Sequence, residues 1–256
     1  MPVALITGGG GGIGRATALK LVASGHAVAL AGRSPGPLEA AADEIRRAGG
    51  EARIFPTDVA KADHVETLVR KTLEEFGEID VLVNAAGYAP MIPTPDVTPE
   101  QWRQILDVNL SSAFYTARAV WPVMRRQHEE FLAEFHTEFP DKPLERSVNT
   151  GGVIVNISSA AARDPFPGLG AYACAKLALN MLTQVLAREG EPLGIRVFGV
   201  APSGVETAMF RQLLSPEQVP SEEILRPDDV ADLIQQAVDG ALRNSSGETI
   251  YLHRRI

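Results

Sequence analysis

Five consecutive glycines, residues 8–12, separate a short apolar run, Val3–Thr7, from a segment of helical composition that begins at Ile13. A short run of aliphatic residues is typical of a buried strand. Glycine lets the backbone approach a ligand closely, and the first turn of a helix offers free N–H groups to a phosphate. A strand, a glycine turn and a helix in this order predict a dinucleotide-binding site; a flexible turn without a ligand is the alternative.

The glycine spacing fits two dinucleotide-binding patterns. The first, G-x-G-x-x-G, uses Gly9, Gly11 and Gly14, and the second, T-G-x-x-x-G-x-G, uses Thr7, Gly8, Gly12 and Gly14. The sequence leaves both open. It argues against a P-loop, because no Gly-Lys-Ser/Thr follows the glycines.

Strand-like and helix-like segments alternate along the whole chain. Further strands are expected at residues 27–31, 52–55, 79–83, 153–157, 195–200 and 248–253, with helices at residues 38–48, 63–76, 99–127, from 171 onwards, and 227–242. This alternation predicts an α/β protein with a doubly wound, Rossmann-like parallel sheet of about seven strands and helices on both faces. Because no linker-like segment divides the 256 residues, we expect a single domain over residues 1–256.

The end of the second predicted strand bears on the choice of dinucleotide. Dinucleotide-binding folds often carry an acidic residue there, which binds the ribose hydroxyls of the adenosine. This chain has Gly32 and Arg33 instead. A guanidinium can bind a 2′-phosphate, and no carboxylate is present to repel it. The sequence therefore predicts NADP(H) rather than NAD(H); an ordinary surface arginine is the alternative.

Small and polar residues follow the third, fourth and sixth predicted strands, at the sheet edge where ligands bind in this architecture. Asp58, beside Val59, can accept a hydrogen bond from an adenine amino group; the alternative is that it caps the helix starting near Asp63 or simply turns the chain. The Asn84–Gly87 segment is small enough for a cofactor to lie against its backbone; tight strand–helix packing is the alternative. Thr207 and the backbone of Val205 can hold a carboxamide, in what would otherwise be an ordinary loop.

The stretch from Val153 to Asn180 carries the candidate chemistry. Ser158 and Ser159 follow a predicted strand, and Tyr172 and Lys176 lie four residues apart, on one face of a predicted helix. A nearby Lys⁺ lowers the pKa of a phenol from its usual value of about 10. Such a tyrosine can exchange a proton with an alcohol or carbonyl near neutral pH. A half-buried helix aromatic and a solvated lysine are the alternative.

Further polar residues and loops lie around this stretch. Asn109 falls inside a predicted helix, where asparagine is unfavourable. It is either a tolerated polar residue or the site of a local backbone distortion that binds a water. Residues 88–98, 163–170 and 207–225 are expected to be loops that shape a substrate pocket. Cys174 is expected to be a small packing residue rather than a nucleophile.

The stretch from Arg125 to Asn149 reads as a helical continuation over residues 128–136 and a loop over residues 140–149. His128 and His136 match no common metal-ligand spacing, so we expect a solvated helix face and no metal. The stretch precedes the strand at residues 153–157 and therefore lies at the amino end of that strand, away from the ligand edge. We expect this insertion, near residues 126–150, to be peripheral or to form a subunit contact.

The bulk properties limit the possible partners and compartments. A net charge of -8 and an isoelectric point near 5.2 argue against a nucleic-acid surface. A single cysteine excludes an internal disulfide and suits a reducing cytosol. We expect no signal peptide, because no charged leader precedes the first apolar run, and no apolar run approaches the length of a membrane span. The expectation is a cytoplasmic protein.

Taken together, the motifs resemble those of the short-chain dehydrogenase/reductase family over nearly the whole chain. The matching pieces are Thr7-Gly8-x-x-x-Gly12-Ile13-Gly14, Asp58-Val59, Asn84-Ala85-Ala86-Gly87, Asn109, Ser159, Tyr172-x-x-x-Lys176 and Pro202-Ser203-Gly204-Val205-Glu206-Thr207. Each piece is short, but their joint order and spacing are specific.

The resemblance implies a role for each candidate catalytic residue. Tyr172 would be the general acid or base on the substrate oxygen, and Ser159 would hold and polarise that oxygen. Lys176 would bind the nicotinamide ribose and lower the pKa of Tyr172, and Asn109 would hold a water in a proton relay to Lys176. A carbonyl that accepts a hydride develops oxyanion charge, which two hydroxyl donors stabilise.

The resemblance also implies a cofactor site, a reaction and an assembly. The implied cofactor-binding residues are Thr7, Gly8, Gly12, Ile13, Gly14, Arg33, Asp58, Val59, Asn84, Ala85, Gly87, Tyr172, Lys176, Pro202, Val205 and Thr207. The implied reaction is NADP(H)-dependent hydride transfer to or from a small-molecule carbonyl or alcohol, with 3-oxoacyl thioesters among the candidate substrates. The family commonly pairs the helices of Asn109 and Tyr172 between subunits, so a homodimer or homotetramer is expected.

Three features depart from the pattern of the family. Ser203 replaces a usual glycine, Gly11 stands where many NADP(H) enzymes have a basic residue, and the insertion near residues 126–150 is longer than usual. The expectation of NADP(H) therefore depends on Arg33. A non-catalytic NADP(H)-sensing regulator is the competing function, but such sensors usually lose the tyrosine or the lysine, and both are present here. A nucleotide-sugar epimerase is disfavoured, because no additional substrate domain is expected.

Overall fold

A seven-stranded parallel sheet forms the centre of the computed structural model, which describes residues 1–140 and 150–254. Its strand order is β3-β2-β1-β4-β5-β6-β7. The strands are β1 (Val3–Thr7), β2 (Ala27–Gly32), β3 (Ala52–Pro56), β4 (Val81–Asn84), β5 (Gly152–Ile157), β6 (Ile195–Pro202) and β7 (Thr249–Leu252). The order reverses direction between β1 and β4, and doubly wound sheets bind ligands at such a switch point. The predicted sheet is confirmed.

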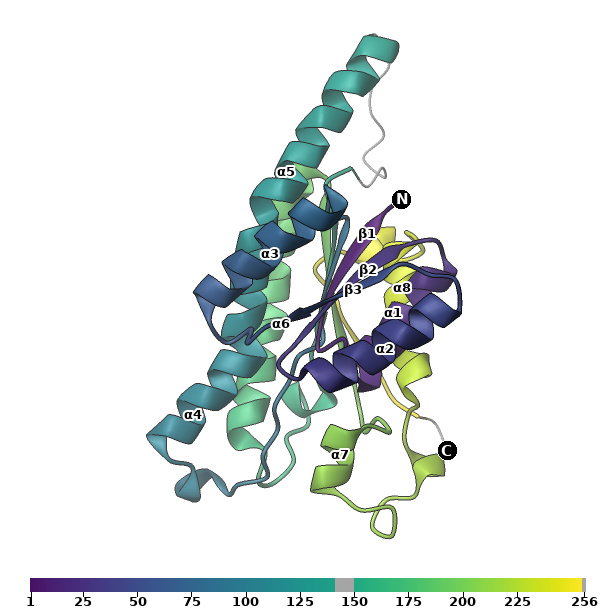
Figure 1. Cartoon of the computed structure of the whole chain (residues 1–256). Coiled ribbons are helices and arrows are strands. Elements are labelled where there is room, and N and C mark those ends of the chain that lie inside the picture. Colours follow the sequence, from purple (N-terminus) through teal and green to yellow (C-terminus); the bar gives the residue numbers. More distant parts are fainter. Residues whose placement is uncertain (141–149, 255–256) are drawn as a thin grey trace.

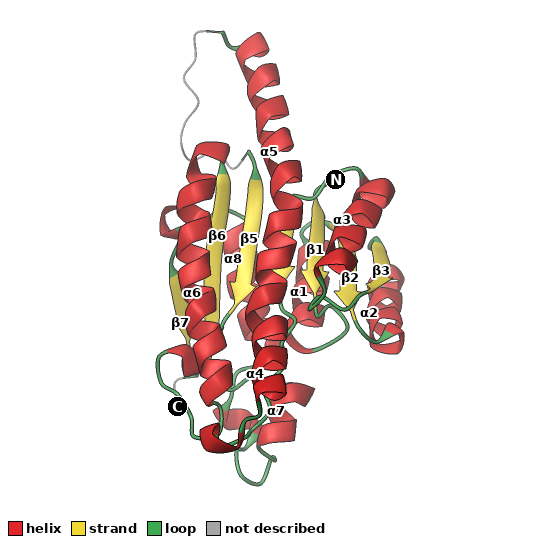
Figure 2. Cartoon of the chain, turned by 90° about the vertical axis from the view of Figure 1, so that its left-hand side faces the viewer, coloured by secondary structure: helices red, strands yellow, loops and turns green. Residues whose placement is uncertain are grey.

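Helices cover both faces of the sheet (Figures 1 and 2). One face packs against α1 (Gly12–Ala23), α2 (Pro35–Arg47) and α8 (Pro227–Val238), and the other against α3 (Ala62–Phe76), α5 (Ser112–Glu138) and α6 (Gly170–Gly190). Two shorter helices, α4 (Pro99–Leu106) and α7 (Ala208–Leu213), lie beyond the carboxyl ends of the strands (Figure 2).

The apolar strands divide their side chains between two cores. In β1, Ile6 belongs to the core that contains Leu21 of α1 and Ile234 of α8, whereas its neighbour Leu5 belongs to the core that contains Val120 of α5. Every residue of β1 is buried, as expected of a parallel strand with helices on both sides. The continuous apolar run in the sequence therefore reflects burial on both faces.

The helix predicted over residues 99–127 is interrupted in the structure. Between α4 and α5 the backbone forms a π-helical segment, Asp107–Ser111, which contains Asn109. π-Helical segments are rare and are frequent at functional sites. Of the two interpretations of Asn109, the structure supports a local backbone distortion.

Helix α5 continues well past the amino end of β5 and projects from the body of the protein (Figures 1 and 2). The expected helical continuation and its position away from the carboxyl edge are therefore confirmed. The expectation that His128 is solvated is wrong: this side chain is buried, and its Nδ1 shares a short hydrogen bond with the hydroxyl of Thr150. His136 is exposed. Most of the loop predicted at residues 140–149 lies outside the described residues.

Candidate active site

A cavity of about 550 Å³ opens at the carboxyl edge of the sheet, around the switch point. The glycine turn, the segments that follow β2 to β6, and helices α6 and α7 all contribute to its wall. Of the predicted site residues, the following line it: Gly8, Gly12, Ile13, Arg33, Asp58, Val59, Ala85, Gly87, Ser159, Tyr172, Lys176, Pro202, Val205 and Thr207. Thr7, Gly14, Asn84 and Asn109 are not among the lining residues.

The geometry of the glycine turn distinguishes between the two patterns that the sequence left open. A Cβ atom on Gly14 would lie 2.3 Å from the carbonyl oxygen of Gly8, and one on Gly8 would lie 2.8 Å from the carbonyl oxygen of Ala85. Gly8 and Gly12 also have positive φ angles, 70° and 49°. A Cβ atom on Gly11, in contrast, would meet nothing within 4 Å. The turn therefore requires glycine at the positions of T-G-x-x-x-G-x-G.

Thr7 bonds to the backbone of the neighbouring segment rather than facing the cavity. Its hydroxyl accepts a hydrogen bond from the backbone N–H of Ala86 at 3.2 Å and lies 3.5 Å from the carbonyl oxygen of Val83. These contacts connect the end of β1 to the segment after β4, which does line the cavity. Thr7 is thus a structural residue of the site.

Asn84 belongs to a buried polar network that runs from one helix to another across two neighbouring strands, on one face of the sheet. The hydroxyl of Thr116 donates to Asn84 Oδ1 at 2.7 Å, and Asn84 Nδ2 donates to Asn156 Oδ1 at 2.9 Å. Asn156 Nδ2 in turn donates to the hydroxyl of Thr183 at 3.0 Å. The chain of bonds joins α5, β4, β5 and α6. Sequence reasoning did not single out Asn156, although a polar residue inside a predicted buried strand was a usable signal.

Arg33 and Asp58 line the same cavity as the glycine turn. Arg33 is exposed and forms no ion pair within the described part of the chain, so its guanidinium is available to an anion. Asp58 Oδ1 accepts a hydrogen bond from the backbone N–H of Ala60 at 3.2 Å. Asp58 therefore stabilises its own turn and also lines the cavity, but it does not cap α3, whose N-cap is Lys61. Its contact with adenine stays a prediction.

Ser159, Tyr172 and Lys176 meet where β5 ends against α6. Lys176 Nζ donates to the carbonyl oxygen of Ile157 at 2.8 Å, and the hydroxyl of Ser158 donates to the carbonyl oxygen of Lys176 at 3.2 Å. These bonds fix the helix to the strand end. Ser159 faces the phenol of Tyr172 and acts to lower its pKa. The two serines are thus separated by role: Ser158 holds the backbone, and Ser159 faces the phenol.

Burial controls the protonation of this group. It raises the pKa of the Tyr172 phenol, and Ser159 opposes that rise. Lys176 is only 3% exposed, and its burial lowers the Lys176 pKa to about 7. The expectation that Lys176 lowers the pKa of Tyr172 is therefore wrong for this structure, because burial disfavours the charge on Lys176 that would stabilise a phenolate.

Asn109 orients the backbone beside the cavity. Its Nδ2 donates to the carbonyl oxygens of Tyr88, at 2.6 Å, and Ile105, at 2.8 Å, and its Oδ1 accepts from the N–H of Tyr88 at 3.1 Å. These bonds hold the loop that follows Gly87. The water relay from Asn109 to Lys176 stays a prediction.

The outer part of the cavity is largely apolar. The three loops expected to shape a substrate pocket contribute Ala89, Met91, Phe166, Leu169, Met209, Phe210, Leu213 and Leu214 to this part of the wall, and Val108 lies beside them. Asp164 also lines this part of the cavity and contributes a carboxylate to it. Cys174 is exposed on α6, so the expectation that it is a small packing residue is wrong for this chain by itself.

No group of histidine, cysteine and carboxylate side chains suited to a metal ion occurs within residues 1–140 and 150–254. Over the same residues, no helix combines the length and the apolar character needed to cross a membrane.

Comparison with known proteins identifies the family. The short chain dehydrogenase family profile matches residues 2–130 and 144–218, which is well over half of the chain. The chain belongs to the short chain dehydrogenase family. Short chain dehydrogenases are oxidoreductases that bind a nicotinamide cofactor and act on small molecules.

Individual short chain dehydrogenases resemble the chain over most of its length. A 3-oxoacyl-[acyl-carrier-protein] reductase of Synechocystis sp. is 33% identical over 96% of this chain and 93% of its own length. The short-chain reductase protein NovJ of Streptomyces niveus is 39% identical over 82% of this chain and 72% of its own. A crystal structure of 3-ketoacyl-(acyl-carrier-protein) reductase from Brucella melitensis, complexed with NADH, superposes with a TM-score of 0.84 at 27% identity, covering 98% of this chain and 96% of that one.

Proposed function

We propose that the protein is an NADP(H)-dependent oxidoreductase that transfers a hydride between the nicotinamide cofactor and a carbonyl or alcohol substrate. One observation carries the proposal: the Ser159 hydroxyl and the Tyr172 phenol meet in the cavity that begins at the glycine turn, with Lys176 on the same helix. A hydroxyl and a protonated phenol are two donors for a carbonyl oxygen that gains negative charge.

The residues present fit a dinucleotide. The glycine turn leaves no room for a Cβ atom at Gly8 or Gly14, and it leads into the first turn of α1, whose N–H groups suit a diphosphate. Arg33 would bind the 2′-phosphate, which favours NADP(H) over NAD(H). Thr207 and the backbone of Val205 would bind the carboxamide. When bound, the cofactor supplies or accepts the hydride.

In the reducing direction, Tyr172 supplies a proton. Its raised pKa keeps the phenol protonated at neutral pH, so it can donate to the substrate oxygen as the carbonyl carbon gains a hydride. Ser159 holds the same oxygen by a hydrogen bond. An ammonium with a pKa of about 7 readily returns a proton to a phenolate, so Lys176 reprotonates Tyr172, through a water held at Asn109.

The apolar outer cavity supports a substrate with an apolar body. Its aliphatic and aromatic side chains have no hydrogen bonds to offer, whereas burial of apolar area contributes about 25 cal/mol per Å². The names of the relatives from Synechocystis and Brucella add 3-oxoacyl thioesters to the candidates. Apolar ketones and 3-oxoacyl thioesters are therefore the first substrates to test.

We further propose a homodimer or homotetramer in the cytoplasm. Four large apolar side chains are strongly exposed on α5 and α6: Phe114 (46%), Leu177 (58%), Met181 (59%) and Val185 (42%). An apolar group of this kind on the surface is typical of a subunit interface. Sedimentation velocity of the wild type and of a Leu177→Glu, Met181→Glu variant tests it; a wild-type monomer would refute it.

The experiment that tests the reaction follows NADPH oxidation at 340 nm with a panel of apolar ketones and 3-oxoacyl thioesters. General acid catalysis contributes roughly 100- to 10,000-fold, so Tyr172→Phe should reduce kcat by a factor in that range. Tyr115→Phe, on α5, is the matched control and should retain activity. Equal rates for the wild type and Tyr172→Phe would contradict the assignment.

A further inference from the structure

The segment from Glu206 to Leu225 leaves the sheet and returns to the same point. The N–H of Glu206 donates to the carbonyl oxygen of Leu225 at 2.8 Å, and the N–H of Leu225 donates to that of Gly204 at 2.9 Å. Between these ends the regular structure consists of α7 and a single 3-10 turn, Ser221–Glu223. Figure 1 shows the segment beyond the carboxyl ends of the strands. Neither a strand nor a long helix fixes its shape.

The side chain of Arg211 occupies the middle of this segment. Its Nε donates to one carboxylate oxygen of Glu206 at 2.8 Å, and its Nη2 makes a short bond to the other. Nη2 also donates to the hydroxyl of Ser221 at 3.1 Å, and Nη1 donates to the carbonyl oxygens of Val219, at 2.7 Å, and Leu214, at 3.4 Å. One guanidinium thereby connects the start, middle and end of the segment.

These contacts differ from those of an ordinary surface ion pair. Exposed pairs contribute little to stability, because water screens the charges and both side chains lose entropy. Arg211 is only 16% exposed, its contact with Glu206 is bidentate, and it also satisfies two backbone carbonyls. Lysine carries the same charge, but it lacks the planar arrangement of donors that reaches all these acceptors at once.

The opposite side of the segment is a wall of the cavity. Met209, Phe210, Leu213 and Leu214 all line it, and they flank Arg211 in the sequence. Leu214 belongs to both sides: its carbonyl oxygen accepts a hydrogen bond from Arg211, and Leu214 also lines the cavity. Movement of the guanidinium would therefore move the apolar wall.

We infer that Arg211 is a positioning residue that holds the Glu206–Leu225 segment in place as the substrate-side wall of the cavity, and so sets which apolar substrates the site accepts. This inference rests on the proposed oxidoreductase function. Arg211 does not touch the reacting atoms in this role. It acts through Leu214 and the other wall residues, and the effect appears in substrate binding rather than in the hydride-transfer step.

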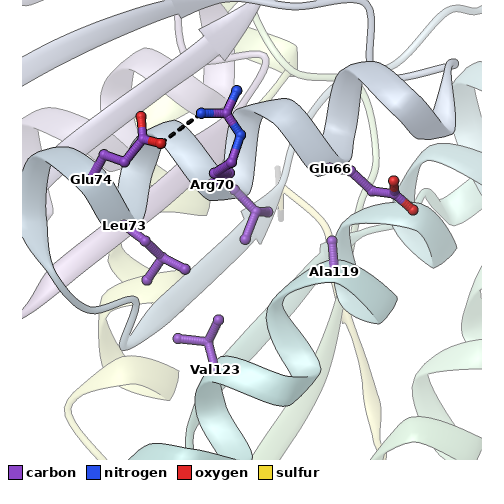
Figure 3. Close-up of a pocket in the computed structure, with 7 residues that line it drawn as sticks. Glu66, Arg70, Leu73, Glu74, Ala119 and Val123 are labelled. Atoms are coloured by element: carbon purple, nitrogen blue, oxygen red, sulfur yellow. Dashed lines mark hydrogen bonds and ion pairs between the residues drawn. The ribbon is translucent and has the colours of Figure 1, made fainter.

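The first test needs no substrate. Hydrogen–deuterium exchange is compared for the wild-type full chain, Arg211→Gln, Arg211→Lys and a control, Arg70→Gln. Arg70 also pairs with a glutamate, Glu74, but on the exposed face of α3, beside a shallow groove between α3 and α5 (Figure 3). In Arg211→Gln, peptides covering residues 212–221 should exchange at least about tenfold faster, because local opening exposes their amides. The control should leave these peptides unchanged.

The second test separates binding from chemistry. For a long-chain apolar ketone, Arg211→Gln should raise KM by about tenfold and change kcat by less than about twofold, since a lost positioning contact weakens substrate binding. For a ketone too short to reach the wall, both constants should stay near those of the wild type. Arg211→Lys should recover part of the KM.

The possible results decide separately on the role of Arg211 and on the proposed function. Unchanged exchange in Arg211→Gln overturns the inference, and so do equal effects on the long and the short ketone. If the wild type reduces no carbonyl compound at all, the proposed function fails, and the exchange measurement still decides whether Arg211 holds the segment.

Discussion

Removal of the Lys176 ammonium should abolish a rise in the free energy of unfolding between neutral and alkaline pH. The structure buries this group almost completely, with one hydrogen bond, to the carbonyl oxygen of Ile157. Burial lowers the Lys176 pKa from 10.5 in the unfolded chain to about 7 in the folded one. Between these two values the unfolded chain binds more protons, so the free energy of unfolding of the wild type rises with pH.

The size of this effect follows from the shift. Each pKa unit corresponds to about 1.36 kcal/mol, so a shift of roughly 3.5 units corresponds to about 5 kcal/mol over the whole titration, of which about 4 kcal/mol falls between pH 7 and 10.5. Lys176→Met lacks the titrating group. It also loses the hydrogen bond to Ile157, but that loss is the same at every pH. The stability of the variant relative to the wild type should therefore fall by about 4 kcal/mol from pH 7 to pH 10.

Urea unfolding, followed by tryptophan fluorescence at one protein concentration and without added nucleotide, measures the difference at each pH. Lys71→Met, on the exposed face of α3, is the matched control for the replacement of a lysine by methionine. A constant difference for Lys176→Met would mean that Lys176 keeps its charge in the folded protein. The proton-return step that we assign to it would then need another explanation.

Four further outcomes are expected. Gly14→Ala should weaken NADPH binding at least about tenfold in fluorescence titration, because its Cβ would meet a carbonyl oxygen at 2.3 Å; Gly11→Ala, in open space, should bind normally. Arg33→Ala should raise KM for NADPH by about 10- to 100-fold and leave that for NADH within about twofold; equal effects would remove the 2′-phosphate argument. Asn84→Ala should lower the free energy of unfolding by about 1–3 kcal/mol, measured in urea, and a smaller loss would show that the network tolerates the unpaired amide of its neighbour. Because burial raises the Tyr172 pKa, the single-turnover rate of carbonyl reduction, which does not require Lys176 to return a proton, should not fall with rising pH until the pH exceeds about 10, the usual phenol value; a fall near neutral pH in the single-turnover profile would contradict this.

The sequence was most informative where backbone geometry restricts the residue type. A glycine turn between the first strand and the first helix was recognisable, but only the structure showed that Gly8, Gly12 and Gly14, rather than Gly9, Gly11 and Gly14, form the pattern. The spacing of Tyr172 and Lys176 was recognisable because residues four apart share a helix face. Alternating apolar runs predicted the parallel sheet, since strands covered on both faces need apolar residues throughout.

Features that depend on contacts between distant segments were not predictable in this way. Asn84 comes directly before residues that line the cavity, but its side chain pairs with Asn156, which is 72 residues away. The sign of the Tyr172 pKa shift depends on how deeply the chain buries both Tyr172 and Lys176. His128 was expected in solvent because the pattern of its own helix does not reveal Thr150, which covers it.

The π-helical segment Asp107–Ser111 fixes the rotational setting of everything that follows it on α5. An α-helix advances about 100° per residue, whereas a π-helix takes about one residue more for the same turn. The extra residue is therefore absorbed within Asp107–Ser111, and the side chains that follow keep their faces. If these five residues were wound as an α-helix with none deleted, the rest of α5 would turn by about 100°. Thr116 would then rotate away from Asn84, and side chains now directed at solvent would face the sheet. The π winding of this segment is therefore what keeps Thr116 directed at Asn84.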